Sequence, residues 1–182
     1  MAAPTVEAGA PAGKALALLN RLDAVSRFVN RALAGLAGVA LVAMMLFTVF
    51  DVVMRALGRP VAGSFEVIGW LSAVAMALAL GYVQVHRGHV AMTLLTGRLE
   101  GRPLALLEVI TGLMSMGLFA AVAWFLFRYG QVLQSTGSLS ETLRIVIYPW
   151  VYVVTVGFAG LTLALFLDLL RSIGRLITGS PP

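Results

Sequence analysis

Residues 32–54 read ALAGLAGVALVAMMLFTVFDVVM, and this stretch decides the class of fold. Asp51 is its only ionisable side chain. An α-helix rises about 1.5 Å per residue and bilayer hydrocarbon is about 30 Å thick, so about 20 apolar residues are needed to cross it. Residues 32–54 therefore predict a transmembrane helix.

Three further stretches are apolar and long enough to cross a bilayer: residues 64–85, 104–127 and 149–170. The spans must be helical, because lipid satisfies no backbone N–H or C=O group and none of them alternates like a barrel strand. We therefore expect an all-α membrane protein, with four transmembrane helices forming one domain over residues 32–170.

The composition of the 182-residue chain fits this fold. Apolar residues make up 60% and charged residues 12%, against about half and about a quarter in soluble domains. The absence of cysteine excludes disulfides, thiol nucleophiles and most zinc or iron–sulfur sites. The net charge of +5 comes from residues scattered along the chain, so no nucleic-acid partner is indicated.

The segment before the first span has two parts. Residues 1–13 are rich in Ala, Pro and Gly without apolar periodicity, which predicts a disordered tail. Residues 14–31 are amphipathic, with Leu22 on the apolar face and Asp23 and Asn30 on the polar face. This pattern predicts an interfacial helix lying on the membrane; the alternative is a helix that extends the first span into water.

The distribution of lysine and arginine predicts the orientation. Nine of them lie in the two terminal segments and the second connection, against four in or beside the first and third connections. Positive charge in short loops marks the cytoplasm, so both termini, with a tail over residues 171–182, and the second connection are expected there. Aromatic side chains near the opposite helix ends predict a belt at the outer interface: Trp70, Trp124, Trp150, Tyr129, Tyr148 and Tyr152.

Two carboxylates near the outer boundary are the candidates for chemistry in the membrane. Asp51 is followed at i+4 by Arg55, which favours a local ion pair over ion conduction. Glu66, in the first turn of the second span, either complements the positive helix end or pairs with Arg55, Arg59 or a partner subunit. The alternative function, a free-standing ion-coupled transporter or channel using Asp51 and Glu66, would need both carboxylates on one aqueous path.

The remaining patterns predict neither an enzyme nor a cofactor site. His86 and His89 offer two ligands without a third, so no metal is expected. The chain has no phosphate-binding loop and no Ser/His/Asp set, and its spans lack the broken helices of a self-sufficient transporter. A helper role follows by elimination.

Two local patterns concern packing. Ser138 to Glu141 matches a capping box, which predicts a short helix ending before Pro149. Small residues four apart are candidates for close helix packing: Ala77 with Gly81, Gly117 with Ala121, and Gly160 with Ala164.

The chain resembles the small membrane subunit, or Q component, of tripartite ATP-independent periplasmic (TRAP) transporters. The resemblance covers nearly the whole chain and rests on the four-span plan and on a series of residues around the first, second and fourth spans: Arg55, Pro60, Glu66, Trp70, Gly81, Arg87, His89 and Ile147 to Trp150. The chain departs from the family pattern at Phe65 and Thr93, where the family often has acids.

The resemblance implies a subunit of a complex in the bacterial inner membrane. In that family a periplasmic binding protein captures an organic anion, and a large membrane subunit imports it with sodium. The small subunit binds the large one, is surrounded by membrane lipid, and steadies its partner. The candidate structural or partner-interface residues are Asp51, Arg55, Glu66, Trp70, Gly81, Arg87, His89 and Pro149.

Overall fold

The computed structural model describes residues 10–87 and 102–178, which form four helices and two connections. The helices are α1 (Ala10–Ala56), α2 (Ser64–Arg87), α4 (Arg102–Thr136) and α5 (Tyr148–Thr178). Each contains a segment long and apolar enough to cross a membrane: Arg21–Ala56, Ser64–His86, Val109–Thr136 and Tyr148–Gly174. The predicted all-helical fold with four spans is confirmed.

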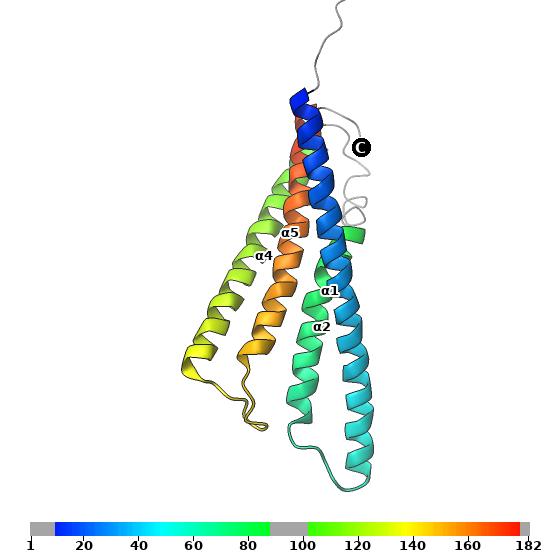
Figure 1. The fold of residues 1–182 in the computed structure, drawn as a ribbon, viewed down its shortest axis with the longest axis vertical. Coiled ribbons are helices and arrows are strands. Elements are labelled where there is room, and N and C mark those ends of the chain that lie inside the picture. The colour runs from blue at the N-terminus through cyan, green and yellow to red at the C-terminus, as the bar shows by residue number, and fades with distance from the viewer. Residues whose placement is uncertain (1–9, 88–101, 179–182) are drawn as a thin grey trace, which may run out of the picture.

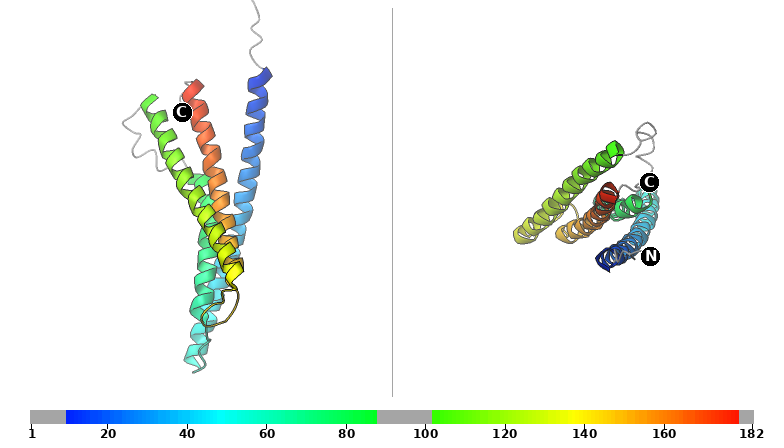
Figure 2. Two further views of the ribbon diagram at one scale, coloured as in Figure 1. Left: turned by 90° about the vertical axis from the view of Figure 1, so that its left-hand side faces the viewer. Right: turned by 90° about the horizontal axis from the view of Figure 1, so that it is seen from above.

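The helices form an open arrangement, which we call the layer, instead of a closed bundle: α1, α2 and α5 pack on one another, and α4 packs on α5. Figure 1 shows α1 beside α2 and α4 beside α5, and α2 also packs against α5. Helix α4 packs along α5 and makes no comparable contact with α1 or α2, so it lies at one edge of the layer when seen from above in Figure 2. One end of the layer, the terminal end, carries the start of α1 and the end of α5; the other, the loop end, carries connections 57–63 and 137–147.

Helix α1 runs without a break from Ala10 to Ala56, where the sequence predicts a separate interfacial helix over residues 14–31. Its 47 residues extend about 70 Å at the usual helical rise, well beyond the hydrocarbon thickness. The continuous helix corresponds to the alternative in which the amphipathic segment extends the first span. Its start also includes residues 10–13, which we expected to be disordered.

The amphipathic part of α1 turns its polar face toward the other helices. Asp23, Ser26 and Asn30 are buried, whereas Val25 and Phe28 are exposed. With Val29 and Ala34 half-buried beside it, one row of buried and half-buried positions recurs every three and four residues along the helix: Asp23, Ser26, Asn30, Leu33, Ala37, Ala40, Met44, Phe47, Asp51 and Met54. This is the spacing of a coiled-coil contact strip, so α1 packs on its neighbours through one narrow stripe that is polar near both ends.

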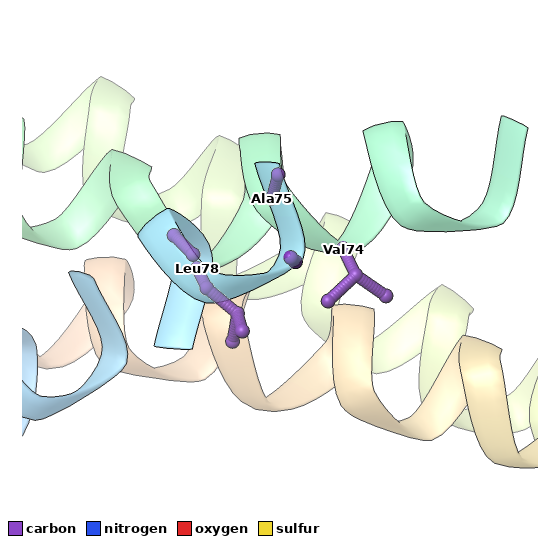
Figure 3. Packing of buried hydrophobic residues seen from close by; sticks show 5 residues of the cluster. Val74, Ala75 and Leu78 are labelled. Carbon is purple, nitrogen blue, oxygen red and sulfur yellow. The ribbon is translucent and has the colours of Figure 1, made fainter. Parts of the chain in front are cut away.

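The apolar middle of this stripe packs on α2. Ala37 and Ala40 of α1 form a buried cluster with Val74, Ala75 and Leu78 of α2. Figure 3 shows the three α2 residues lying among turns of the neighbouring helices. Small side chains let the helix backbones approach closely, which is the main source of packing energy between helices in lipid.

Connection 137–147 does not contain the short helix that the capping-box pattern predicts. Leu139 and Val146 form an antiparallel bridge, and the Ser140 N–H donates to the Ile145 C=O at 2.9 Å. The bridge brings positions 139 and 146 together and leaves only a tight turn between them, in which Arg144 has a φ of 56°. A helix over the same residues would hold those two positions apart, so the bridge and the helix exclude each other.

Candidate functional site

Asp51 and Arg55 tie the end of α1 to the start of α2. Arg55 Nε donates to Asp51 Oδ2 at 2.8 Å, which confirms the expected ion pair, and Arg55 Nη2 donates to Ser64 Oγ at 2.9 Å. The Arg55 guanidinium also lies 5.0 Å from the ring centroid of Phe65, a favourable cation–π distance. Asp51 and Ser64 are buried while Arg55 is partly exposed. Arg55 thus links the end of α1 to the start of α2.

Glu66 fastens connection 137–147 onto α2. Its Oε2 accepts a hydrogen bond from Ser140 Oγ at 2.6 Å, and its Oε1 accepts one from the Thr142 N–H at 2.8 Å. The Leu143 N–H donates to Glu66 Oε2 at 3.3 Å. Hydrogen bonds to an ionised carboxylate are among the stronger kind in proteins. Of the alternatives considered for Glu66, pairing with Arg55 or Arg59 is not what the structure shows, because the hydrogen bonds of Glu66 go to connection 137–147.

Two apolar contacts support this fastening. Gly63 has a φ of +76°, and a Cβ at this position would meet Leu143 Cγ at 2.5 Å. The side chain of Leu143 therefore occupies a space that only glycine leaves open. Trp70 of α2 stacks on Trp150 of α5, with ring centroids 5.5 Å apart. Trp150 directly follows Pro149 in the first turn of α5, so Pro149 lies where the connection enters the helix.

Asn30 joins three helices near the terminal end. Its side chain is fully buried, and Nδ2 donates to the Ser26 C=O of α1 at 3.0 Å and to the Gly160 C=O of α5 at 3.4 Å. Asn30 Oδ1 lies so close to Gly81 of α2 that a Cβ there would clash with it. Gly81 and Gly160 thus lie at close helix contacts, as expected for small residues. Their missing side chains leave the space that Asn30 occupies.

The closest backbone approach joins α2 and α5. A Cβ at Gly157 would lie 2.6 Å from the carbonyl carbon of Ala77 and 2.9 Å from the nitrogen of Leu78. Gly117 of α4, also expected at a close contact, faces away from the other helices, and a Cβ added there would have nothing within 4 Å. The expected packing role of Gly117 within this chain is therefore wrong.

The terminal end carries a second set of polar contacts. Asp23 of α1 pairs with Arg27 at 2.6 Å and, across the layer, with Arg171 of α5. Gln84 of α2 donates to Asp168 of α5 at 3.3 Å. The amphipathic pattern, which predicts a helix on the membrane surface, would instead place Asp23 on a solvated face. Polar residues recur every three and four positions in residues 23–30, but this spacing marks a polar face without showing whether the face meets solvent or protein.

His86, near the end of α2, takes no part in these junctions. His86 is exposed, with Nδ1 at 3.0 Å from the Tyr82 C=O and its ring 4.0 Å from that of Tyr82. Arg87 is the last residue of α2, and His89 lies outside the described residues. Within residues 10–87 and 102–178, no three His, Cys, Asp or Glu side chains gather to hold a metal ion.

The comparisons with known proteins identify the family. A family model described as "Tripartite ATP-independent periplasmic transporters, DctQ component" matches residues 44–175, well over half of the chain. No curated protein and no solved structure gives a significant match. The matched range covers α2, α4, most of α5, and the Asp51–Arg55 and Glu66 junctions. The chain belongs to the DctQ family, the small membrane component of TRAP transporters.

Proposed function

We propose that this protein steadies the large membrane subunit of a TRAP transporter during sodium-coupled uptake of an organic anion delivered by a periplasmic binding protein. The main support is that three carboxylates of the chain bind groups of the same chain and hold its helices and loops together. Asp23, Asp51 and Glu66 all accept hydrogen bonds or ion pairs from donors of the same chain. These three carboxylates fasten one helix to another, which is a structural use and not that of an ion path.

The placement of the carboxylates supports the same function. Asp51 lies level with Ser64, the first residue of α2, and Glu66 lies one residue beyond Phe65 in the first turn. Both are at the loop end, and they bond to different partners. A free-standing channel would need carboxylates along one path through the layer. Asp51 and Glu66 are instead both at one end and held by different partners, which gives that alternative no support.

A fixed scaffold also needs helices that resist sliding. Three contacts resist sliding of α2 against α5: the Gln84–Asp168 hydrogen bond at the terminal end, the Trp70–Trp150 stacking at the loop end, and the approach of Gly157 to the Ala77 backbone between them. We further propose that the terminal end faces the cytoplasm, so that the Asp51–Arg55 and Glu66 junctions lie on the periplasmic side of the inner membrane.

Affinity purification tests the partnership. The tagged chain is co-expressed with the large TRAP membrane subunit of the same transporter and purified in mild detergent. We expect the large subunit to be recovered in constant proportion, and Arg55→Glu or Glu66→Lys to lower its recovery by loosening the loop end. Glu141→Lys changes an exposed charge in connection 137–147, the loop that Glu66 binds, and serves as the control. Absence of the large subunit from the purified wild-type sample would contradict the proposal.

A further inference from the structure

Helix α4 is held by the rest of the layer on one side only. That side packs on α5: Phe119 stacks on Phe158, and Gly130 lies against the ring of Tyr152. In the most apolar stretch of its membrane span, no residue is buried. The corresponding stretches of α1, α2 and α5 all contain buried residues.

The opposite side of α4 carries a regular row of exposed residues, which we call the free α4 face. Its members are spaced alternately three and four residues apart, so they lie along one side of the helix: Met114, Gly117, Ala121, Trp124 and Arg128. Gly117 and Ala121 form a shallow notch between two large side chains, because Met114 is 72% and Trp124 is 61% exposed. No described part of the chain enters this notch at Gly117.

Arg128 is a cation inside a membrane span without a partner in the described residues. It lies two residues before Gly130, which packs on Tyr152 in the second turn of α5, so it is not at the helix end. Arg27, Arg55 and Arg171 are paired with carboxylates of this chain, but Arg128 makes no hydrogen bond, ion pair or ring contact within residues 10–87 and 102–178. Arg21 and Arg31, which form no ion pair there either, belong to the amphipathic segment of α1.

We propose that the free α4 face is the docking surface for a transmembrane helix of the large TRAP subunit, and that this helix presents a carboxylate to Arg128. The inference rests on the proposed function. Arg128 lies within a candidate span beside the interfacial residues Trp124 and Tyr129, where a charge that faces another helix is costly unless it is paired. The notch at Gly117 and Ala121 is the kind of surface that lets a second backbone approach. Lipid phosphate could satisfy Arg128, but acyl chains gain nothing from the notch.

Two matched glycine variants test the docking face. Gly117→Leu fills the notch, whereas Gly38→Leu adds the same side chain to the outward side of α1; neither position has any atom within 4 Å of an added Cβ. Both variants should therefore give a folded, monodisperse subunit. We expect Gly117→Leu to lower co-purification of the large subunit about tenfold, as for overpacking of an interface, and Gly38→Leu to leave it unchanged.

Because the chain contains no cysteine, single cysteines give an independent readout. Ala121→Cys and Val42→Cys, on α4 and on the exposed side of α1, are labelled with a short photoreactive maleimide in membranes that contain the complex. We expect a cross-link to the large subunit from position 121 and none from position 42. A cross-link from 42 alone, or unchanged recovery with Gly117→Leu, would overturn the docking face while co-purification of the wild type still supports the proposed function.

The Arg128 pairing has its own test in the same complex. Arg128→Gln should lower recovery of the large subunit about tenfold, the upper range for loss of a hydrogen-bonded charge pair, and Arg128→Lys should restore much of it. Unchanged recovery with Arg128→Gln, accompanied by loss of co-purified anionic phospholipid, would assign Arg128 to lipid and overturn its pairing with the large subunit. If the wild-type chain itself recovers no large subunit, the proposed function fails instead.

Discussion

Asn30 of α1 fills the space that a side chain at Gly81 of α2 would need. The amide is buried completely and is anchored to Ser26 in its own helix and to Gly160 in α5. In the observed alignment Asn30 Nδ2 is hydrogen-bonded, although Oδ1 has no hydrogen-bond partner among the described residues. A polar residue at one position of a coiled-coil stripe favours one register of the helices, because alignments that remove its hydrogen bonds are costly. We therefore interpret Asn30 as the residue that sets how α1 lies against α2 and α5.

Gly81→Ala should lower the stability of the isolated subunit, because the new methyl group meets Asn30. Overpacking of this kind costs about 1–3 kcal/mol. Thermal unfolding in detergent, followed by circular dichroism, measures the loss, with Gly38→Ala as a control that meets no atom within 4 Å. The same midpoint for both variants would contradict the Asn30–Gly81 contact.

Asn30→Ala should make Gly81→Ala tolerable. The single change removes the hydrogen bonds to Ser26 and Gly160 and is itself destabilising. In the double variant the clash is gone, so the two effects should be less than additive by about 1 kcal/mol. A double-mutant cycle on thermal stability gives the coupling, and strict additivity would show that the two residues do not touch.

Gly157→Ala should be more damaging than Gly81→Ala. The obstacle at position 157 is the backbone of Ala77, which cannot move unless α2 and α5 separate. At position 81 the nearest obstacle is the Asn30 side chain, and the nearest backbone atom, the Leu161 nitrogen, is farther away at 3.2 Å. We expect poor yield or an aggregated elution profile on size-exclusion chromatography for Gly157→Ala; equal yields of the two variants would argue against backbone contact between α2 and α5.

Glu66→Gln should free connection 137–147 from α2. The amide side chain keeps its size but loses the charge that strengthens the hydrogen bonds from Ser140, Thr142 and Leu143. Hydrogen exchange at Thr142 and Leu143 should become about tenfold faster, as expected for a local opening made easier. Glu141→Gln, at an exposed position in the same loop, should leave both rates unchanged. Unchanged exchange in Glu66→Gln would show that the carboxylate does not hold the loop.

Arg55→Met should destabilise the junction between α1 and α2. The double variant Asp51→Asn with Arg55→Met should be less destabilised than this single variant. The single variant leaves Asp51 buried without its cation and Ser64 without its donor, and an uncompensated buried charge costs more than a lost pair. Thermal unfolding of the three proteins provides the ranking. A double variant less stable than Arg55→Met would contradict the role of Arg55 as the counter-ion.

Features set by short-range chemistry could be predicted from the sequence. Apolar length gives the four spans, and the i+4 spacing gives the Asp51–Arg55 pair. The inward direction of Asn30 was not predicted, because amphipathicity reveals that a helix has two faces and not which face meets protein when the surrounding solvent is lipid. Residues 23–30 therefore looked like a helix on the membrane surface.

Contacts between residues far apart in the chain could not be predicted. Glu66 and Ser140 are 74 positions apart, and Asp23 meets Arg171 only because α1 and α5 pack against each other in the fold. The capping-box pattern at Ser138 to Glu141 predicted a short helix that does not form, and the backbone amides of Thr142 and Leu143 donate instead to Glu66 of α2. A local motif cannot reveal that its acceptor is supplied by another helix.

Sodium-driven uptake in proteoliposomes tests the central claim most directly. The binding protein and a sodium gradient are supplied to vesicles that contain the large subunit alone, this chain alone, or both. The account predicts uptake of the organic anion only when the large subunit is present, with a higher rate and a longer-lived activity when this chain accompanies it. Uptake by vesicles that contain this chain alone would contradict the account.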